Sequence, residues 1–265
     1  MALIGHVSLV GAGPGDPGLL TRRAIARLRA ADLVLYDALV DERILRYARH
    51  AQRFFVGKRA GRHAMTQDAI QRLLIRGARR GKKVVRLKGG DPLVFGRGAE
   101  EALALRRAGV PYDIVPGISS AIAAPAAAGI PVTHRGVSSA FLVVSAHDEA
   151  SFAAATEGLR PNRVTLVVLM GLGRSAAIAC RLIDACWSRR TPVSVITDAT
   201  TRRQQTWHGT LDDLAEDRLV VESAAAGTIV IGDVVKIGQM LDAGERAGAD
   251  AWASGDEPRE VTTCL

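Results

Sequence analysis

Residues 84–98 constrain the fold more than any other segment, because a short apolar run is followed there by a glycine-rich loop. Val84–Leu87 has the length and the residue types of a buried strand. Gly89 and Gly90 follow it, and residues without side chains let a ligand come close to the main chain. Asp91 then stands at the carboxyl end of the strand, where open α/β sheets bind their ligands. A plain strand-to-helix junction needs one glycine rather than four within ten residues, so we predict a ligand-binding loop.

The first half of the chain alternates strands with helices. Besides Val84–Leu87, apolar runs predict strands at His6–Val10, Asp32–Tyr36, Arg53–Val56 and Tyr112–Val115. Helices are expected at 21–30, 66–80 and 98–107, with threonine caps at the start of the first two. This alternation is typical of a parallel sheet whose strands are joined by helical crossovers.

The second half shows a different pattern. A helix is expected at 118–125. After 129–136, strands are expected at Ala140–Ser145, Arg163–Leu169, Pro192–Thr197, Gln204–Gly209 and Thr228–Ile231, with helices at 175–187 and 211–216. Two consecutive strands within 192–209 indicate an antiparallel component. We therefore predict an α/β fold with a mainly parallel N-terminal sheet and a mixed C-terminal sheet. The expected units are domain 1–117, domain 118–243 and a mobile tail at 244–265.

Residues 11–18, Gly-Ala-Gly-Pro-Gly-Asp-Pro-Gly, look like a dinucleotide-binding loop but lack its requirements. Asp16 replaces the third glycine of G-x-G-x-x-G, and Pro14 lacks an amide that a pyrophosphate would need. The sequence also contains no G-x-x-x-x-G-K-[ST] motif, which argues against a nucleoside triphosphate. We interpret the loop as a rigid rim that lets a ligand lie against the backbone.

The net charge of +8 favours an anionic partner, which could be nucleic acid, an acidic membrane surface or a polycarboxylate. A nucleic-acid-binding protein is expected to gather basic residues on one face, with aromatic side chains between them. Aromatic residues are only 4% of this chain, and arginines such as Arg22 and Arg23 fall on scattered helix faces. We therefore expect no nucleic-acid partner.

The cysteines and the apolar runs indicate where the protein works. Cys180, Cys186 and Cys264 form no CxxC pair, which favours a reducing compartment, and we interpret the first two as packing residues. No apolar run reaches the roughly 18 residues of a membrane span, and the first ten residues lack the pattern of a signal peptide. We expect a cytoplasmic protein with no membrane partner.

The local sequence leaves two interpretations open for Asp37 and for the loop 57–63. Asp37 directly follows an apolar strand, and the sequence leaves open whether it caps the next turn or takes part in chemistry. The loop 57–63 carries two glycines and four residues that can be positively charged. Such a loop is either a solvated basic segment or a site for carboxylates or phosphates.

Seven short motifs, in this order and spacing, resemble the tetrapyrrole methylase family. They are Val10–Pro17 (VGAGPGDP), Tyr36–Val40 (YDALV), Val56–Gly61 (VGKRAG), Arg86–Gly98 (RLKGGDPLVFGRG), Val115–Ile118 (VPGI), Gly129–Arg135 (GIPVTHR) and Met170–Gly171. One such motif would be a weak signal, whereas seven in order over residues 7–238 are a strong one.

The resemblance implies that methyl groups pass from S-adenosylmethionine to two pyrrole carbons of uroporphyrinogen III, giving precorrin-2 on the way to sirohaem, cobalamin or haem d1. It also implies two α/β domains with a cofactor trough between them, and a homodimer. Because a sulfonium is already a strong electrophile, the reaction needs alignment rather than a metal. An alternative is a sister methylase of the same fold that acts on a later precorrin, on diphthine or on ribosomal RNA. The complete motifs at 57–61 and 89–98 argue against it.

The resemblance also assigns roles to individual residues. The residues expected to contact the cofactor are Pro14, Gly89, Gly90, Asp91, Val94, Ser119, Ser120, Met170 and Ala199. Those expected to act in catalysis are Asp37, Lys58, Arg97, Glu100 and Arg135. The substrate carries eight carboxylates, for which Arg59, Arg62, Arg97 and Arg135 are the expected partners, and this also accounts for the basic charge. Either Glu100 or Asp37 could remove the ring proton.

Overall fold

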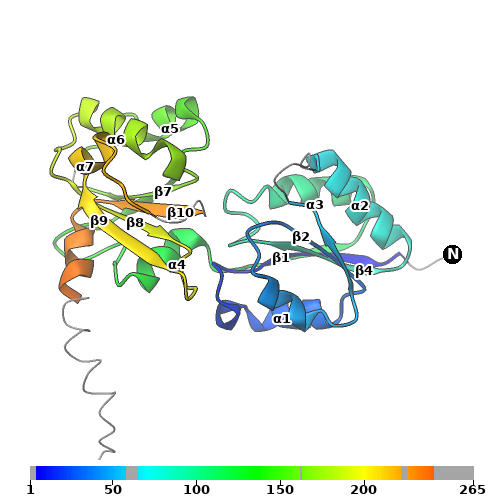
Figure 1. Ribbon diagram of the computed structural model, residues 1–265. Coiled ribbons are helices and arrows are strands. Elements are labelled where there is room, and N and C mark those ends of the chain that lie inside the picture. The colour runs from blue at the N-terminus through cyan, green and yellow to red at the C-terminus, as the bar shows by residue number, and fades with distance from the viewer. Residues whose placement is uncertain (1–3, 58–64, 162, 222–225, 242–265) are drawn as a thin grey trace, which may run out of the picture.

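The computed structural model describes residues 4–57, 65–161, 163–221 and 226–241, and within these it shows two α/β halves, each built on a five-stranded sheet (Figure 1). The first half contains β1 (His6–Gly11), β2 (Leu33–Tyr36), β3 (Gln52–Phe55), β4 (Lys83–Lys88) and β5 (Tyr112–Val115). The second contains β6 (Phe141–Ser145), β7 (Thr165–Leu169), β8 (Pro192–Thr197), β9 (Gln205–Thr210) and β10 (Gly227–Ile231). Every expected strand is present, which confirms the predicted α/β class.

The helices lie between these strands. In the first half they are η1 (Pro17–Leu19), α1 (Arg22–Arg29), η2 (Glu42–Tyr47), α2 (Gln67–Arg79) and α3 (Gly98–Arg107). In the second half they are α4 (Ser120–Ala127), α5 (Glu149–Thr156), η3 (Leu172–Arg174), α6 (Ser175–Asp184) and α7 (Leu211–Ala215). Thr21 and Thr66 cap α1 and α2 through their hydroxyl oxygens, as their place in the sequence predicts.

The first sheet is parallel throughout and has the strand order β3-β2-β4-β1-β5. Val85 and Leu87 of β4 pack with α1 and η2, whereas Val84 packs with α2 and α3, because successive side chains of a strand point to opposite faces. The connections that leave β1 and β4 therefore run over opposite faces, although these two strands are neighbours. Such a reversal opens a crevice at the carboxyl ends of the strands, and ligands bind there in open α/β sheets.

The second sheet has the strand order β6-β7-β10-β8-β9 and is mixed. β6 and β7 are parallel, β10 is antiparallel to both of its neighbours, and β8 is antiparallel to β9, as the two consecutive strands predicted. Helices α5, α6 and α7 cover one face, and α4 packs on the other together with the helical residues 234–241 (Figure 1).

Five helical segments are not predicted by the sequence pattern: η1, η2, α5, η3 and residues 234–241. Helix α5 buries only Phe152 and Thr156, so it lacks the apolar stripe by which an amphipathic helix is recognised. Its one local signal is Asp148, whose carboxylate accepts a hydrogen bond from the Ser151 amide at 2.8 Å.

The expectation that Cys180 and Cys186 are packing residues is wrong, since both are exposed. The buried stripe of α6 runs through Ile178, Ala179 and Leu182, which leaves Cys180 on the outer face of the helix. Cys186 comes after the helix has ended.

Asp113 joins three elements of the first half. Its Oδ1 accepts a hydrogen bond from Ser8 Oγ at 2.6 Å and lies 2.8 Å from His6 Nε2, and its Oδ2 accepts one from Arg27 Nη2 at 2.9 Å. Burial alone would raise the pKa of Asp113, but the hydrogen bonds from Ser8, His6 and Arg27 outweigh it and hold the pKa below its ordinary value. This carboxylate therefore ties β1, β5 and α1 together.

The two sheets do not by themselves fix the domain boundaries that the sequence predicts. Helix α4 follows the last strand of the first sheet and packs against the second, and the boundaries after 117 and 243 stay predictions. The predicted tail, 244–265, and Cys264 lie outside the described residues. Within the part of the chain that the structure describes, no helix has the length and apolar character needed to cross a membrane.

Candidate active site

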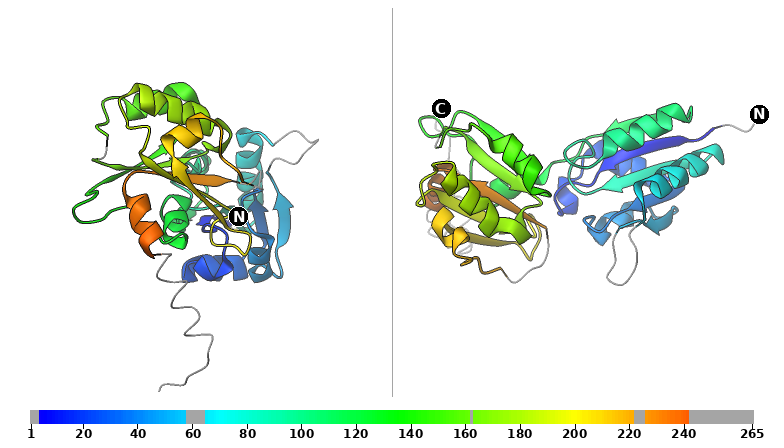
Figure 2. Two further views of the ribbon diagram at one scale, coloured as in Figure 1. Left: turned by 60° about the vertical axis from the view of Figure 1, so that its left-hand side comes forward. Right: turned by 90° about the horizontal axis from the view of Figure 1, so that it is seen from above.

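A cleft of about 730 Å³ lies where the two halves meet. The right-hand view of Figure 2 shows the two halves side by side, the second half on the left and the first half on the right. One wall consists of the segments that follow β1, β2 and β4, and the other of the segments that follow β7 and β8 together with the start of β10. The cleft therefore includes the crevice between β1 and β4 that the strand order predicts.

Backbone atoms form the floor of the cleft. Gly13 and Gly90 exchange two hydrogen bonds, of 2.8 and 3.1 Å, between the loops after β1 and β4. A Cβ atom on Gly117 would come within 2.3 Å of the Gly90 carbonyl oxygen, so only glycine fits there. Asp91 completes the arrangement, because its Oδ2 accepts a hydrogen bond from the Gly117 amide at 3.0 Å and its Oδ1 one from the Leu93 amide at 2.8 Å. Asp91 thus shapes the floor that it lines.

The glycine-rich rim after β1 contacts the second half. The Asp16 amide donates a hydrogen bond to Thr200 Oγ1 at 3.1 Å. A Cβ atom on Gly15 would lie only 2.8 Å from the Thr201 side chain. The loop 11–18 therefore connects the two halves of the protein at this end of the cleft.

Backbone strain is concentrated at the cleft. Seven non-glycine residues in the described ranges have a positive φ, and four of them line the cleft: Phe95, Arg97, Met170 and Asp198. A sparsely populated backbone conformation of this kind costs about 1–3 kcal/mol and persists only where the surroundings enforce it. Such residues gather at ligand-binding sites more than elsewhere.

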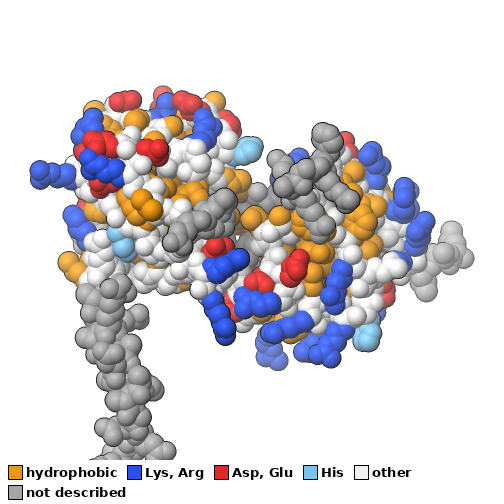
Figure 3. Space-filling model, in the orientation of Figure 1, with side chains coloured by type: hydrophobic (Ala, Val, Ile, Leu, Met, Phe, Trp, Pro, Cys, Tyr) orange, Lys and Arg blue, Asp and Glu red, His pale blue; other side chains and the backbone are white. Residues whose placement is uncertain are grey.

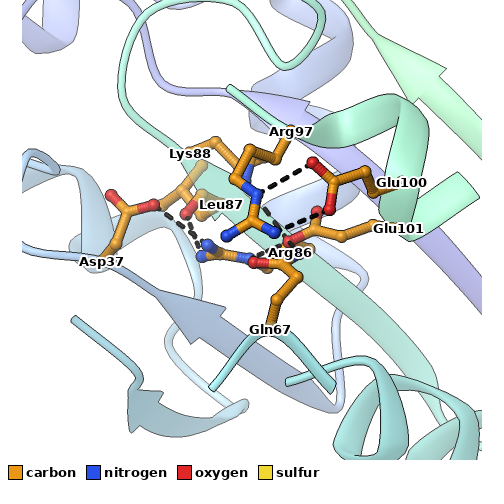
Figure 4. Close-up of polar contacts among 8 residues, drawn as sticks. All are labelled: Asp37, Gln67, Arg86, Leu87, Lys88, Arg97, Glu100 and Glu101. Carbon is orange, nitrogen blue, oxygen red and sulfur yellow. Dashed lines mark hydrogen bonds and ion pairs between the residues drawn. The ribbon is translucent and has the colours of Figure 1, made fainter. Parts of the chain in front are cut away.

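A network of buried charged side chains lies beside the floor (Figure 4). Arg86 and Lys88 point to the same face of β4, where α2 and α3 pack, and their side chains are 4% and 6% exposed. Both donate to Oε1 of the fully buried Glu101 on α3, at 3.1 and 3.3 Å. Arg86 also donates to Asp37 Oδ2 at 3.0 Å. Asp37 follows β2, the neighbour of β4, which explains how it comes into reach.

The pKa of Lys88 is lowered in this buried network. Burial lowers the pKa of Lys88, the positive charge of Arg86 lowers it further, and Glu101 and Asp37 offset only part of the shift. The sequence interpretation assigned no role to Arg86, Lys88 or Glu101. The signal it contained was the presence of two cations, Arg86 and Lys88, on the same face of β4 as the apolar Val84.

A second acid–base pair is exposed near this network. Arg97 and Glu100 form two hydrogen bonds, of 2.9 and 2.7 Å, and their side chains are 58% and 51% exposed. The hydrogen bonds from Arg97 lower the pKa of Glu100, although burial acts in the opposite direction. Figure 4 shows this pair above the buried network.

The structure brings most of the predicted site residues together. All nine predicted cofactor contacts line the cleft, and so do Asp37 and Arg97. Glu100 and Arg135 are exposed and are not among the described residues that line it. Lys58, Arg59 and Arg62 lie outside the described residues. The individual roles of all these residues stay predictions.

The fold and the cleft define a class of protein: a two-sheet α/β protein with a cleft along a glycine-rich floor at the carboxyl ends of its first sheet. In the described ranges, no group of three or more His, Cys, Asp or Glu side chains is placed to hold a metal ion. Comparison with known proteins narrows this class. The model of the family Tetrapyrrole (Corrin/Porphyrin) Methylases matches residues 6–215. The chain belongs to the tetrapyrrole methylase family, as its seven motifs indicate.

Individual relatives agree with this assignment. The uroporphyrinogen-III C-methyltransferase of Methanocaldococcus jannaschii is 43% identical over 238 residues, which are 89% of this chain and 98% of that protein. The siroheme synthase of Actinobacillus pleuropneumoniae is 45% identical over 90% of this chain but only 49% of its own length. The structure of uroporphyrin-III C-methyl transferase from Thermus thermophilus complexed with S-adenyl homocysteine is 42% identical, with a TM-score of 0.76, over 88% of this chain and 100% of that one.

Proposed function

We propose that this chain is an S-adenosylmethionine-dependent C-methyltransferase that converts uroporphyrinogen III into precorrin-2 by two successive methylations. The observation that carries the proposal is the convergence of the predicted cofactor contacts. Nine residues from five separate parts of the sequence line one cleft. The relatives named above support both the donor and the substrate.

The cleft suits the donor in shape and chemistry. Val94 and Met170 expose 38% and 49% of their surface there, which provides apolar contacts for an adenine ring or a thioether chain. Helix α4 begins at Ser120, and amides at the start of a helix favour a carboxylate. When bound, S-adenosylmethionine supplies an electrophilic methyl group.

The charged side chains of the cleft suit a polycarboxylate substrate. Arg97 and Arg203 are exposed at the cleft and can donate to carboxylates in pairs. We propose that Arg59, Arg62 and Arg135 also bind carboxylates of the substrate. On the face that Figure 3 shows, basic side chains lie on both halves and are mixed with acidic ones rather than gathered into a stripe. Such a distribution favours a small anionic substrate over nucleic acid.

The protein must also remove a proton from the methylated ring. We propose Asp37 or Glu100 for this step, and Lys58 as a second acid–base group. Asp37 lines the cleft, and one of its oxygens is held by Arg86. Glu100 is ionised over a wide pH range, because its hydrogen bonds with Arg97 lower its pKa. A base held in position contributes about 10²- to 10⁴-fold to the rate of a proton transfer.

We also propose that the enzyme is a cytoplasmic homodimer that needs no metal. Ile118 and Ile122 support the dimer, because both are at least 36% exposed and lie at the start of α4, Ile118 just before its N-cap and Ile122 in its first turn. Apolar side chains in that arrangement suit an interface. Light scattering coupled to size-exclusion chromatography measures the assembly, and a monomer at micromolar concentration would contradict it.

The function is tested by an anaerobic time course with uroporphyrinogen III generated in place, S-adenosylmethionine and the purified chain, followed by absorbance. Mass spectrometry then counts the methyl groups gained. Two methyl groups are expected, and chelator-treated protein is expected to give the same result. If no methyl group is gained while calorimetry still shows S-adenosylmethionine binding, the substrate assignment is wrong and a sister methylase becomes the leading reading.

A further inference from the structure

Arg86 is an unusual residue for the middle of a buried strand, and all three of its guanidinium nitrogens are engaged. Nη2 donates to Asp37 Oδ2 at 3.0 Å, Nε donates to Glu101 Oε1 at 3.1 Å, and Nη1 donates to the Leu87 carbonyl oxygen at 3.1 Å. A planar guanidinium held at three points has one orientation. The position of the Asp37 oxygen that it binds is therefore set by Arg86.

Glu101 in turn fixes Arg86. Its side chain is fully buried, and its Oε1 accepts hydrogen bonds from Arg86, from Lys88 at 3.3 Å and from Gln67 on α2 at 3.0 Å. These donors come from a strand and from a neighbouring helix, so Glu101 holds the side chains of three packed elements in one register. Figure 4 shows Arg86 extended between Glu101 on one side and Asp37 on the other.

This network binds only one of the two carboxylate oxygens of Asp37. Its Oδ2 is bound to Arg86, whereas its Oδ1 is buried and has no hydrogen-bond partner among the described residues. A buried acceptor without a donor is costly, and buried polar groups are ordinarily paired. Because Asp37 lines the cleft, a donor on a bound ligand can supply the missing partner.

We propose that Arg86 and Glu101 are positioning residues, which together hold the Asp37 carboxylate in the orientation required for proton transfer during methylation. Arg86 orients one Asp37 oxygen and leaves the other for the substrate, and Glu101 keeps Arg86 in place. This inference rests on the proposed function and adds two residues to the catalytic machinery that motif comparison did not assign. Glu101 is fully buried and outside the cleft lining, and Arg86, which lines the cleft, acts through the Asp37 oxygen that it binds.

A kinetic cycle between Arg86 and Asp37 tests the inference. The wild-type protein, Asp37→Asn, Arg86→Gln and the double variant are assayed for kcat and for KM towards uroporphyrinogen III. Asp37→Asn is expected to lower kcat about 10²-fold or more, and Arg86→Gln up to about 10²-fold, since a small misplacement of a reacting group has that effect. Because Arg86 acts through Asp37, the double variant is expected to be no slower than Asp37→Asn alone.

Further measurements distinguish positioning from a general loss of structure. Binding of S-adenosylmethionine alone, measured by calorimetry, is expected to change less than twofold in Arg86→Gln. Arg86→Lys keeps the charge but lacks the planar fork, and it is expected to recover part of kcat. If Arg86→Gln does not fold, Arg86→Lys enters the same cycle with Asp37→Asn, because it keeps the buried positive charge opposite Glu101.

Asp113→Asn is the matched control. Asp113 is 26% exposed against 25% for Asp37, and it too accepts a hydrogen bond from an arginine, Arg27 on α1, but it lies outside the cleft. Its kcat is expected to stay within twofold of the wild-type value. A comparable loss in this variant would mean that any damage to the first sheet lowers activity, and would overturn the inference.

The remaining outcomes separate this inference from the proposed function. Wild-type protein that transfers no methyl group to uroporphyrinogen III overturns the proposed function and this inference with it. An active wild type in which the losses from Arg86→Gln and Asp37→Asn multiply overturns only the positioning role. A rise in KM with kcat unchanged also overturns it, because Arg86 would then act in substrate binding.

Discussion

The substitution Glu101→Gln should destabilise the protein strongly, because it removes the carboxylate that two buried cations share and leaves Lys88 without an ion-pair partner among the described residues. Glu101 is fully buried, and both cations that contact it, Arg86 and Lys88, have side chains that are 6% exposed or less. Removing one partner from a buried ion pair costs about 3–5 kcal/mol, which is a large fraction of the roughly 5–15 kcal/mol that stabilises a domain. Arg86 cannot lose its proton to reduce this cost, whereas Lys88 can.

Urea unfolding at pH 7, followed by far-UV circular dichroism, measures this cost. The same substitution in a Lys88→Met background should cost less, because one buried cation fewer is left unpaired. A cost below about 1 kcal/mol in the wild-type background, which is typical of an exposed ion pair, would refute the reasoning, since the network would then have to be solvated.

The sign of the pH dependence follows from Lys88. Burial and the charge of Arg86 lower the pKa of Lys88 in the folded protein below its ordinary value of 10.5. Between the folded pKa and 10.5 the unfolded chain binds more protons than the folded one, so this group makes the free energy of unfolding rise with pH. Glu101 favours the charged lysine, and Glu101→Gln should therefore widen that window towards lower pH. Lys88→Met should remove this contribution.

Three further outcomes are expected. Gly117→Ala places a Cβ atom 2.3 Å from the Gly90 carbonyl oxygen and should weaken S-adenosylmethionine binding at least about 10-fold by calorimetry, whereas Gly173→Ala, where a Cβ atom meets nothing within 4 Å, should not. Asp113→Asn should lower stability by about 1–2 kcal/mol at pH 7. The lowered pKa of Asp113 means that this difference is present above the ordinary value of 3.8 and is lost as the pH falls through the folded pKa, which urea unfolding at several pH values measures. Glu100→Gln should leave the urea midpoint unchanged, because the side chain is exposed, and should lower kcat if Glu100 is the base; unchanged kcat would assign the proton to Asp37.

The strands could be predicted from the sequence because burial repeats along them. β4 and β8 are runs of buried side chains that cannot be mistaken for loops, and the absence of a helix between β8 and β9 correctly indicated antiparallel pairing. Helix α5 could not be predicted in the same way, because Phe152 is its one large buried side chain. A single apolar residue cannot show the repeat of apolar positions by which a helix is recognised.

The sequence predicted those parts of the candidate site in which the backbone conformation requires glycine. Gly13 and Gly90, whose loops hydrogen-bond to each other, have φ values of 72° and 64°, a left-handed conformation that favours glycine, and the sequence displays that requirement directly. The buried charges were not predictable, because whether Arg86 is buried depends on Glu101, which reaches it from a helix packed on the sheet. Motif resemblance also suggested Arg135 for this site without being able to show that its side chain is exposed and away from the described cleft lining.

The position of the buried network is itself an argument for its use. A buried ion pair is seldom the most stable choice, since apolar side chains of similar volume often stabilise a core equally well or better. Along the face of β4 that packs on α2 and α3, Val84 is apolar at the amino end, and the charged residues Arg86 and Lys88 come where the strand reaches the cleft. If the charges served stability alone, they would have no reason to be confined to that end. Their confinement to the ligand-binding edge of the sheet indicates that the sequence retains them for what they do to Asp37, at a cost in stability that the apolar half of the same strand helps to offset.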